Sequence, residues 1–208
     1  FPGALNTYTV EAMVQDRKAI QAGTSHFLGQ NFSRAAGIEY ESREGKREFA
    51  WTTSWGVSTR MIGTLLMAHS DDDGLIVPPR VAAPHAVIIP VTPKEETRAA
   101  VLEAAHHLAT AIRATTWHGQ PLTVDVDTRD LGGGVKSWEH IKKGVPVRIE
   151  IGPRDLATSS AMLARRDQPH KSKSPTPLAD LPASLPAILD DIQATLLARA
   201  TAFRDAHT

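Results

Sequence analysis

Residues 85–91 read HAVIIPV, and residues 95–115 read EETRAAVLEAAHHLATAIRAT. The first stretch is a continuous apolar run of strand length, whereas the second spaces its apolar residues as an amphipathic helix does. Further strand-like stretches follow at residues 122–127 and 145–151. Because strands here alternate with a helix long enough to cross a sheet, this region is predicted to be an α/β domain with a mostly parallel sheet.

The chain beyond these strands continues the same domain. We predict a short helix at residues 138–143, a strand at 160–165 and a closing helix at 185–203. Residues 165–177 combine four Lys or Arg residues with Ser and Pro. That composition is typical of an exposed loop.

The amino-terminal part has a different order of predicted elements, with hairpins and short helices. Strand-like runs and helical spacing predict a hairpin at residues 9–23 around Asp16 and Arg17, a helix at 29–36, a hairpin at 39–53 that turns at Glu44 and Gly45, and a helix at 58–69. Pro78 and Pro79 follow, and they cannot continue a central strand. We therefore expect two domains, residues 1–83 and 84–208.

The composition narrows the class of protein. Twenty-three basic residues balance 23 acidic ones, so no overall basic field indicates a nucleic-acid partner, and RNA contacts would have to come from local patches. Without cysteine the chain has no disulfides or thiolate metal sites, which fits a reducing compartment such as the cytoplasm. No apolar run reaches membrane-spanning length. The chain starts with Phe1 and no signal-like segment, and we expect both ends to be cut from a longer protein.

Two polar stretches are candidates for binding sites. Residues 23–32, GTSHFLGQNF, combine glycines with hydroxyl, imidazole and amide side chains, which can orient a small ligand. The alternative is a polar turn that caps a helix, and spacing alone favours it. Residues 53–60, TSWGVSTR, place Ser58, Thr59 and Arg60 at the start of a helix, where anions are favoured. A plain N-cap with one surface arginine is the alternative there.

These blocks are similar to those of a known family. Residues 11–13 (EAM), 21–26 (QAGTSH), 28–32 (LGQNF), 54–60 (SWGVSTR) and 71–79 (DDDGLIVPP) resemble the class II prolyl-tRNA synthetases of the archaeal and eukaryotic type, including their bacterial members. The resemblance is nearly continuous over residues 1–84. It implies an α+β catalytic domain, of which this chain holds only the later, antiparallel strands.

The resemblance also implies roles for individual residues. Arg60 would be the catalytic arginine that holds the phosphates of ATP, with Gln21, Thr24, Ser58 and Thr59 as further ATP contacts. His26 would line the proline pocket, and the resemblance places Phe1, Trp51 and Gly56 near it. ATP and Mg²⁺ are the implied cofactors, and no metal site built from protein side chains alone is expected.

Residues 84–167 resemble the α/β anticodon-binding domain of class IIa synthetases. The matching stretches include residues 127–129 (DTR), 143–155 (KGVPVRIEIGPRD) and 165–167 (RRD). The resemblance implies that Arg148, Arg154 and Asp155 read the two guanines of the proline anticodon, with Lys136 and Glu139 nearby. Arg and Asp suit that chemistry. A surface ion pair of Arg148 with Glu150 is the alternative for that arginine.

The chain departs from the family pattern in two places. Ser137 and Ile141 stand where the family has an aromatic and an acidic residue that contact an anticodon base. The family's first two motifs, which form the dimer interface and part of the active site, would lie before Phe1.

The implied function is activation of proline with ATP and its transfer to proline tRNA, by an enzyme that is a homodimer when intact. Neither DNA nor a membrane is an expected partner. This chain alone is expected to be inactive. The alternative is a non-catalytic tRNA-binding protein derived from a synthetase.

Overall fold

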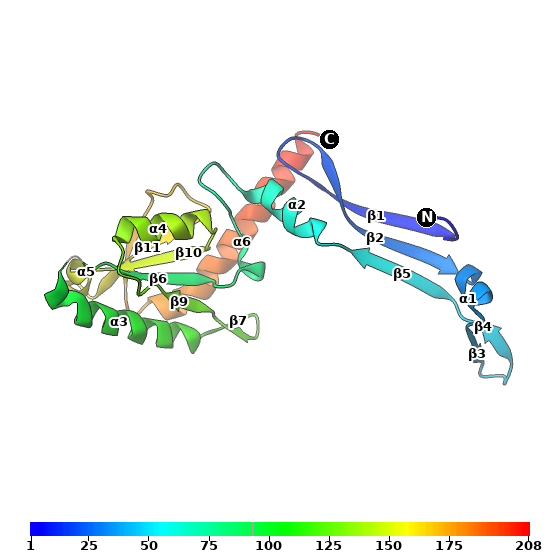
Figure 1. The fold of residues 1–208 in the computed structure, drawn as a ribbon, viewed down its shortest axis with the longest axis horizontal. Helices are drawn as coiled ribbons and strands as arrows, with labels where there is room; N and C mark the ends of the chain where they lie inside the picture. The colour runs from blue at the N-terminus through cyan, green and yellow to red at the C-terminus, as the bar shows by residue number, and fades with distance from the viewer. Residues whose placement is uncertain (93) are drawn as a thin grey trace. The chain divides into compact units, whose positions relative to one another are not determined.

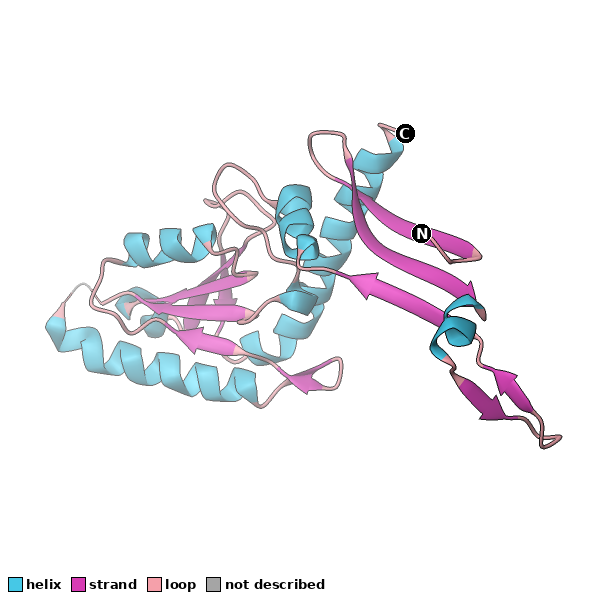
Figure 2. Cartoon of the chain, turned by 45° about the vertical axis from the view of Figure 1, so that its right-hand side comes forward, coloured by secondary structure: helices cyan, strands magenta, loops and turns pink. Residues whose placement is uncertain are grey.

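The computed structural model describes residues 1–92 and 94–208 (Figure 1). They form two compact units, residues 1–68 and residues 69–206. Figure 2 distinguishes the helices from the strands in each unit. Each unit has its own sheet, and the two are described separately.

The first unit is built on a three-stranded antiparallel sheet in the order β1-β2-β5. Its strands are β1 (Asn6–Met13), β2 (Ala19–Gly29) and β5 (Thr52–Val57). The predicted hairpin is confirmed, and Arg17 takes a left-handed conformation in its turn (φ 65°). The structure extends β2 to Gly29, so much of the glycine- and hydroxyl-containing stretch at 23–32 is strand rather than turn.

The strand register separates the side chains of this sheet by chemistry. Across β1, β2 and β5, Thr7 lies opposite His26 and His26 lies opposite Ser54. Two residues further along β1, Thr9 lies opposite Thr24, which lies opposite Gly56. The intervening positions carry Tyr8, Val10, Trp55 and Val57. Because successive residues point to opposite faces, the hydroxyl and imidazole side chains of Thr7, Thr24 and His26 share one face, the polar face. The other face carries the large apolar side chains together with Ser25.

Short elements complete the first unit. They are α1 (Asn31–Ala36), the paired strands β3 (Glu39–Glu41) and β4 (Arg47–Phe49), and α2 (Arg60–His69). The helix predicted at 29–36 and the turn at Glu44 and Gly45 are confirmed. The second hairpin is shorter than predicted, since Thr52 and Thr53 belong to β5 and pair with β2.

The second unit contains a five-stranded sheet in the order β12-β11-β10-β6-β9. The strands are β6 (Ala86–Pro90), β9 (Val124–Val126), β10 (Val147–Ile151), β11 (Ser160–Arg165) and β12 (Ser174–Pro177). β6, β9 and β10 are parallel, whereas β11 and β12 pair antiparallel. The sheet is therefore mixed, and the prediction of a mostly parallel sheet holds only for β9, β6 and β10. The antiparallel part consists of β11, which pairs with β10, and of the edge strand β12, whose prolines are tolerated at a sheet edge.

Helices cover both faces of this sheet (Figure 1). One face buries Val147, Ile149 and Ile151 in the main core, together with apolar residues of α3 (Glu95–Arg113) and α6 (Leu181–Asp205). α4 (Gly133–Lys142) packs against β6 and β10 on the other face. The remaining short elements are η1 (Pro79–Val81), β7 (Thr116–Trp117), β8 (Gln120–Pro121) and α5 (Pro153–Ala157).

Residues 69–83 pack within the second unit, upstream of the expected domain boundary at 83/84. Leu75 donates its N–H to Lys142 O at 3.0 Å, and Val77 donates to Gly144 O at 3.3 Å. Two glycines allow this approach. A Cβ on Gly74 would lie 2.6 Å from Lys142 Cα, and one on Gly144 would lie 2.7 Å from Leu75 O. Segment 71–77 is therefore bound tightly to the turn between α4 and β10.

We predict that Gly144→Ala lowers the free energy of unfolding by about 3 kcal/mol, because the new methyl group clashes with the Leu75 carbonyl and the left-handed backbone (φ 74°) disfavours it. Gly119→Ala is the matched control. Gly119 is also left-handed (φ 77°) but has no atom near its Cβ position, so its cost should be about 1 kcal/mol. Chemical denaturation of the 208-residue chain measures both. Equal costs would contradict the tight contact.

Candidate nucleotide and anticodon sites

A hollow of about 260 Å³ opens at the start of α2, beside Thr24 and Gly56 of the polar face. The residues that line it are Gln21, Ala22, Gly23, Thr24, Gly56, Val57, Ser58 and Arg60. A side chain at Gly56 would point at Thr24, since its Cβ would lie 3.4 Å from Thr24 Oγ1. The glycine thus keeps the floor of the hollow open. Gln21, Thr24, Ser58 and Arg60, expected from the sequence, are brought together here.

Arg60 is the first residue of α2 and is exposed. Its N–H donates to Ser58 Oγ at 3.3 Å, and its Nη1 reaches Gln21 Oε1 at 3.5 Å. Among the described residues no carboxylate pairs with its guanidinium. A free guanidinium beside hydroxyl groups and the first turn of a helix suits an anionic ligand such as phosphate. Thr59 is exposed and does not line this hollow.

His26 lies further along the same polar face. Its ring stacks on Phe1, with 4.5 Å between the ring centroids, and its Nδ1 lies 3.0 Å from Thr7 Oγ1. Trp51 stacks instead on Phe27, at 5.9 Å. Because Phe27 follows His26 directly in a strand, the two side chains point to opposite faces. The structure therefore joins Phe1 with His26 and places Trp51 in a separate aromatic contact.

A second pocket, of about 620 Å³, lies at the carboxyl ends of β6 and β10 in the second unit. It is lined by Val91, Lys94, Thr97, Glu150, Gly152, Pro153, Arg154, Asp155 and Met162. Arg154 is exposed, and Asp155 Oδ2 accepts the N–H of Gly152 at 2.7 Å. Two of the three residues expected to read the anticodon thus share one pocket. Glu150, which also lines it, was not predicted, because from sequence it looked like the ion-pair partner of Arg148.

Arg148 is in an unusual position for a binding residue. It lies on β10 with its side chain fully buried, and none of its three guanidinium nitrogens has a hydrogen-bond partner among the described residues. Burial lowers the pKa of Arg148 to about 10. The alternative considered from the sequence, a surface pair of Arg148 with Glu150, is wrong, because Glu150 pairs with Lys173.

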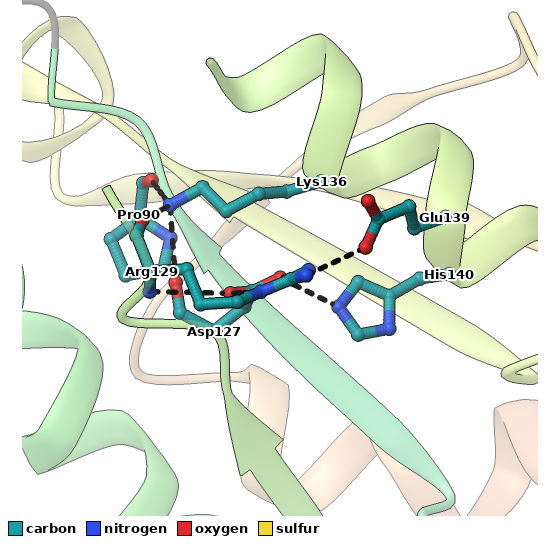
Figure 3. A network of polar contacts seen from close by, with 6 residues as sticks. All are labelled: Pro90, Asp127, Arg129, Lys136, Glu139 and His140. Atoms are coloured by element: carbon teal, nitrogen blue, oxygen red, sulfur yellow. Dashed lines mark hydrogen bonds and ion pairs between the residues drawn. The ribbon is translucent and has the colours of Figure 1, made fainter. Parts of the chain in front are cut away.

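Lys136 is buried as well, although the sequence placed it among residues that contact RNA. Its Nζ donates to the carbonyls of Pro90, Asp127 and Arg129 at 2.9, 3.1 and 3.2 Å (Figure 3). Burial lowers the pKa of its ammonium. All three ammonium hydrogens are used, so the structure does not support an anticodon contact. Lys136 instead ties α4 to the ends of β6 and β9.

Asp127 organises the polar groups around this lysine (Figure 3). Arg129 donates to both of its oxygens, from Nε at 2.8 Å and Nη2 at 2.7 Å, and His140 Nε2 lies 2.9 Å from Oδ2. These hydrogen bonds, those of Arg129 first, hold the pKa of Asp127 well below its usual range. Glu139, expected near the anticodon, accepts from Arg129 Nη1 at 2.7 Å and therefore belongs to this network.

Comparison with known proteins agrees with this geometry. Residues 85–186 match the protein family described as an anticodon binding domain. The whole chain is 65% identical to proline–tRNA ligase of Akkermansia muciniphila and 52% identical to that of Protochlamydia amoebophila. It is 53% identical to proline–tRNA ligase 2 of Anaeromyxobacter dehalogenans.

The chain is homologous to part of the proline–tRNA ligases. It spans about 41% of the length of each of these relatives, and the match covers all of this chain. The resemblance inferred from the sequence is confirmed, and so is the anticodon-binding domain in its second half.

Over residues 1–92 and 94–208 no cluster of three or more His, Cys, Asp or Glu side chains could hold a metal ion. In the same part of the chain, no helix is long and apolar enough to cross a membrane.

We predict that Asp127→Asn lowers the free energy of unfolding at pH 7 by about 3 kcal/mol, because the buried carboxylate holds Arg129 and His140. The wild-type contribution of Asp127 is complete above about pH 5. It is lost as the pH falls further, because the unfolded carboxyl group, with its ordinary pKa near 3.8, binds a proton first. The variant should lack this acid-dependent loss.

Asp130→Asn is the control for that measurement, since the Asp130 side chain is 91% exposed and its ion pair with Arg98 should contribute little. Denaturant unfolding at pH 7 and at several values down to pH 3 compares the two variants with the wild type. If Asp127→Asn matched Asp130→Asn at every pH, the network would not stabilise the unit.

Proposed function

We propose that this chain is part of a proline–tRNA ligase that joins proline to the AMP part of ATP, with release of pyrophosphate, and then transfers the prolyl group to proline tRNA. The observation that carries the proposal is the polar hollow with Arg60 at its edge, in the same chain as an anticodon-binding domain. A protein that only bound tRNA would have no use for an open guanidinium beside a nucleotide-sized set of polar groups.

In the first reaction the carboxylate of proline attacks the α-phosphorus of ATP. One carboxylate oxygen of proline forms a bond to the α-phosphorus, the bond between the α-phosphorus and the oxygen that bridges to the β-phosphate breaks, and pyrophosphate leaves. The carboxylate is already ionised, so no general base is needed. Catalysis then depends on bringing two anions together in line and offsetting their charge.

The residues of the hollow, together with neighbouring residues of the first unit, suit the binding of ATP and proline. Arg60 would bind the phosphates, with Ser58 and Thr59 beside it, while Gln21 and Thr24 would form hydrogen bonds with the adenosine part. His26 and Phe1 would form one wall of the proline pocket, with Gly56 leaving room for the substrate. Trp51 belongs to this pocket only if its contact with Phe27 changes when proline binds.

Mg²⁺ is the ion that this reaction class requires to offset phosphate charge. The side chains of the hollow are neutral or cationic, and no carboxylate lines it. Its donor set therefore suits phosphate and not a metal ion. We accordingly assign no Mg²⁺ ligand to this chain.

In the second reaction a hydroxyl at the 3′ end of a tRNA attacks the carbonyl carbon of prolyl-adenylate. An ester bond forms, the bond to the phosphate breaks, and AMP and a proton are released. We propose that the anticodon of this tRNA is read in the second unit. Arg154 and Asp155 are our candidates for contacts with the two guanines. Arg148 joins them only if it is uncovered. We place the reaction in the cytoplasm and expect the complete enzyme to be a homodimer.

We predict that Arg60→Ala in the full-length gene product reduces proline-dependent ATP–pyrophosphate exchange at least a hundredfold, about 3 kcal/mol of transition-state stabilisation. The lost guanidinium has no neighbouring cation in the hollow to replace it. Arg43→Ala is the matched control, because Arg43 is an exposed arginine in the β3–β4 turn. Near-wild-type exchange by Arg60→Ala would refute the assignment. A wild-type protein that binds proline tRNA but catalyses no exchange would instead be a tRNA-binding protein.

We predict that Arg154→Ala relaxes discrimination at one anticodon guanine by tenfold to a hundredfold, because a guanidinium that donates to guanine is lost. Lys171→Ala, in the exposed segment before β12, should weaken every tRNA alike by losing a phosphate contact. Aminoacylation of proline tRNAs with single anticodon changes measures both variants. If Arg154→Ala rejects altered anticodons as strongly as the wild type, base reading lies elsewhere.

A further inference from the structure

The segment between β11 and β12 is anchored over the second unit by two side chains. Lys173 places its Nζ 2.7 and 2.6 Å from the two carboxylate oxygens of Glu150. His170 Nδ1 lies 2.9 Å from Asp73 Oδ2, and its ring contacts Trp138 edge to face. One of these two anchors therefore depends on a carboxylate that also lines the candidate anticodon pocket.

The two carboxylates of this pocket differ in how firmly they are held. Asp155 accepts the backbone N–H of Gly152 and so completes the first turn of α5. Glu150 is held, among the described residues, only by the ammonium of Lys173, which is carried on a flexible side chain. An ion pair with a lysine near the surface is easily exchanged. Glu150 is therefore the carboxylate that can change partner.

Arg148 lies two residues before Glu150 on the same strand, and so on the same face of the sheet. Within residues 1–92 and 94–208 its buried guanidinium has no hydrogen-bond partner. The neighbouring guanidinium of Arg166 is already bound to Asp71, at 2.8 and 2.5 Å. Burying an unpaired charge is costly, so a ligand that offered acceptor atoms to Arg148 would be favoured. Ile141, also buried, supplies no carboxylate there.

A carboxylate beside a guanidinium is complementary to guanine. On its pairing edge guanine presents two donors, N1–H and the 2-amino group, next to the acceptor O6. A carboxylate can accept from both donors, and a guanidinium can donate to O6. Adenine lacks the 2-amino group and has an amino group in place of O6. The pair formed by Glu150 and Arg148 would therefore select guanine over adenine.

We propose that Glu150 is a guanine-reading carboxylate of this pocket, and that Lys173 holds it until RNA binds. On binding, the base takes the place of Lys173, and the freed ammonium faces an RNA phosphate. This inference rests on the proposed function. It adds Glu150 as a residue that determines specificity, and the ammonium group of Lys173 as the partner that guanine replaces.

Inosine tests the contact directly, because it differs from guanine only by the missing 2-amino group. Binding of the full-length gene product is measured to a proline-tRNA anticodon stem–loop and to copies with inosine at either guanine. We expect inosine at one position to weaken binding of the wild type about tenfold. In Glu150→Gln the ratio of the affinity for the guanine stem–loop to that for the inosine stem–loop should fall to about one. In Glu103→Gln, at an exposed position on α3, this guanine-to-inosine ratio should stay as in the wild type. The ratio is taken within each variant, so a lowered folded fraction does not change it.

Lys173→Met should keep the guanine-to-inosine ratio. It should reduce the steepness of the plot of log binding constant against log salt concentration by about one, since one phosphate contact is lost. An unchanged ratio in Glu150→Gln, or a wild type that binds guanine and inosine equally at both positions, would overturn the inference and leave the proposed function standing. A wild type that binds this stem–loop no better than an unrelated one would contradict both.

Discussion

The ammonium group of Lys136 joins three backbone carbonyls at the edge where the parallel strands of the second unit end. Pro90 ends β6, and Asp127 and Arg129 follow β9, so one buried charge holds these two strand ends to α4. Such burial is tolerated because every hydrogen of the ammonium has an acceptor. Parallel strands end at a common edge, and the end of β10 lies beside that of β6. The pocket that contains Glu150, Arg154 and Asp155 begins there, so its shape depends on this interaction.

The first unit depends on a simpler constraint, the two-residue period of its strands. That period sends Thr24, His26 and Gly56 to one face and Tyr8, Trp55 and Val57 to the other. The proposed nucleotide and proline contacts therefore gather on one surface without any helix to position them, and α2 adds Arg60 at its edge. Trp55 and Val57 are 79% and 78% exposed, so the apolar face is uncovered within this chain.

Sequence patterns predicted the elements that have strong periodicity or clear turns. The hairpin at Asp16 and Arg17, the strands β6, β10 and β11 and the helix α3 are all present. Elsewhere, glycine and proline residues led to wrong predictions of where elements begin. The start of α4 was predicted too late because it contains Gly133 and Gly134, and the edge strand β12 was not predicted because it contains Pro175 and Pro177. The start of α6 was predicted too late because Pro182 lies in its first turn. Site residues were found where a motif resembled a family. Burial could not be predicted in this way, because the depth of Arg148 and Lys136 depends on how α4 packs on the sheet.

The central claim is that one chain carries two separate sites, one for a nucleotide with proline and one for an anticodon. Amide hydrogen exchange of the full-length gene product tests this claim most directly, with ATP and proline added in one experiment and proline tRNA in another. We predict that ATP and proline slow exchange in residues 21–26 and 54–60, and that the tRNA slows exchange in residues 150–155. Protection by ATP that is confined to the second unit, or no protection of residues 150–155 by the tRNA, would contradict the account.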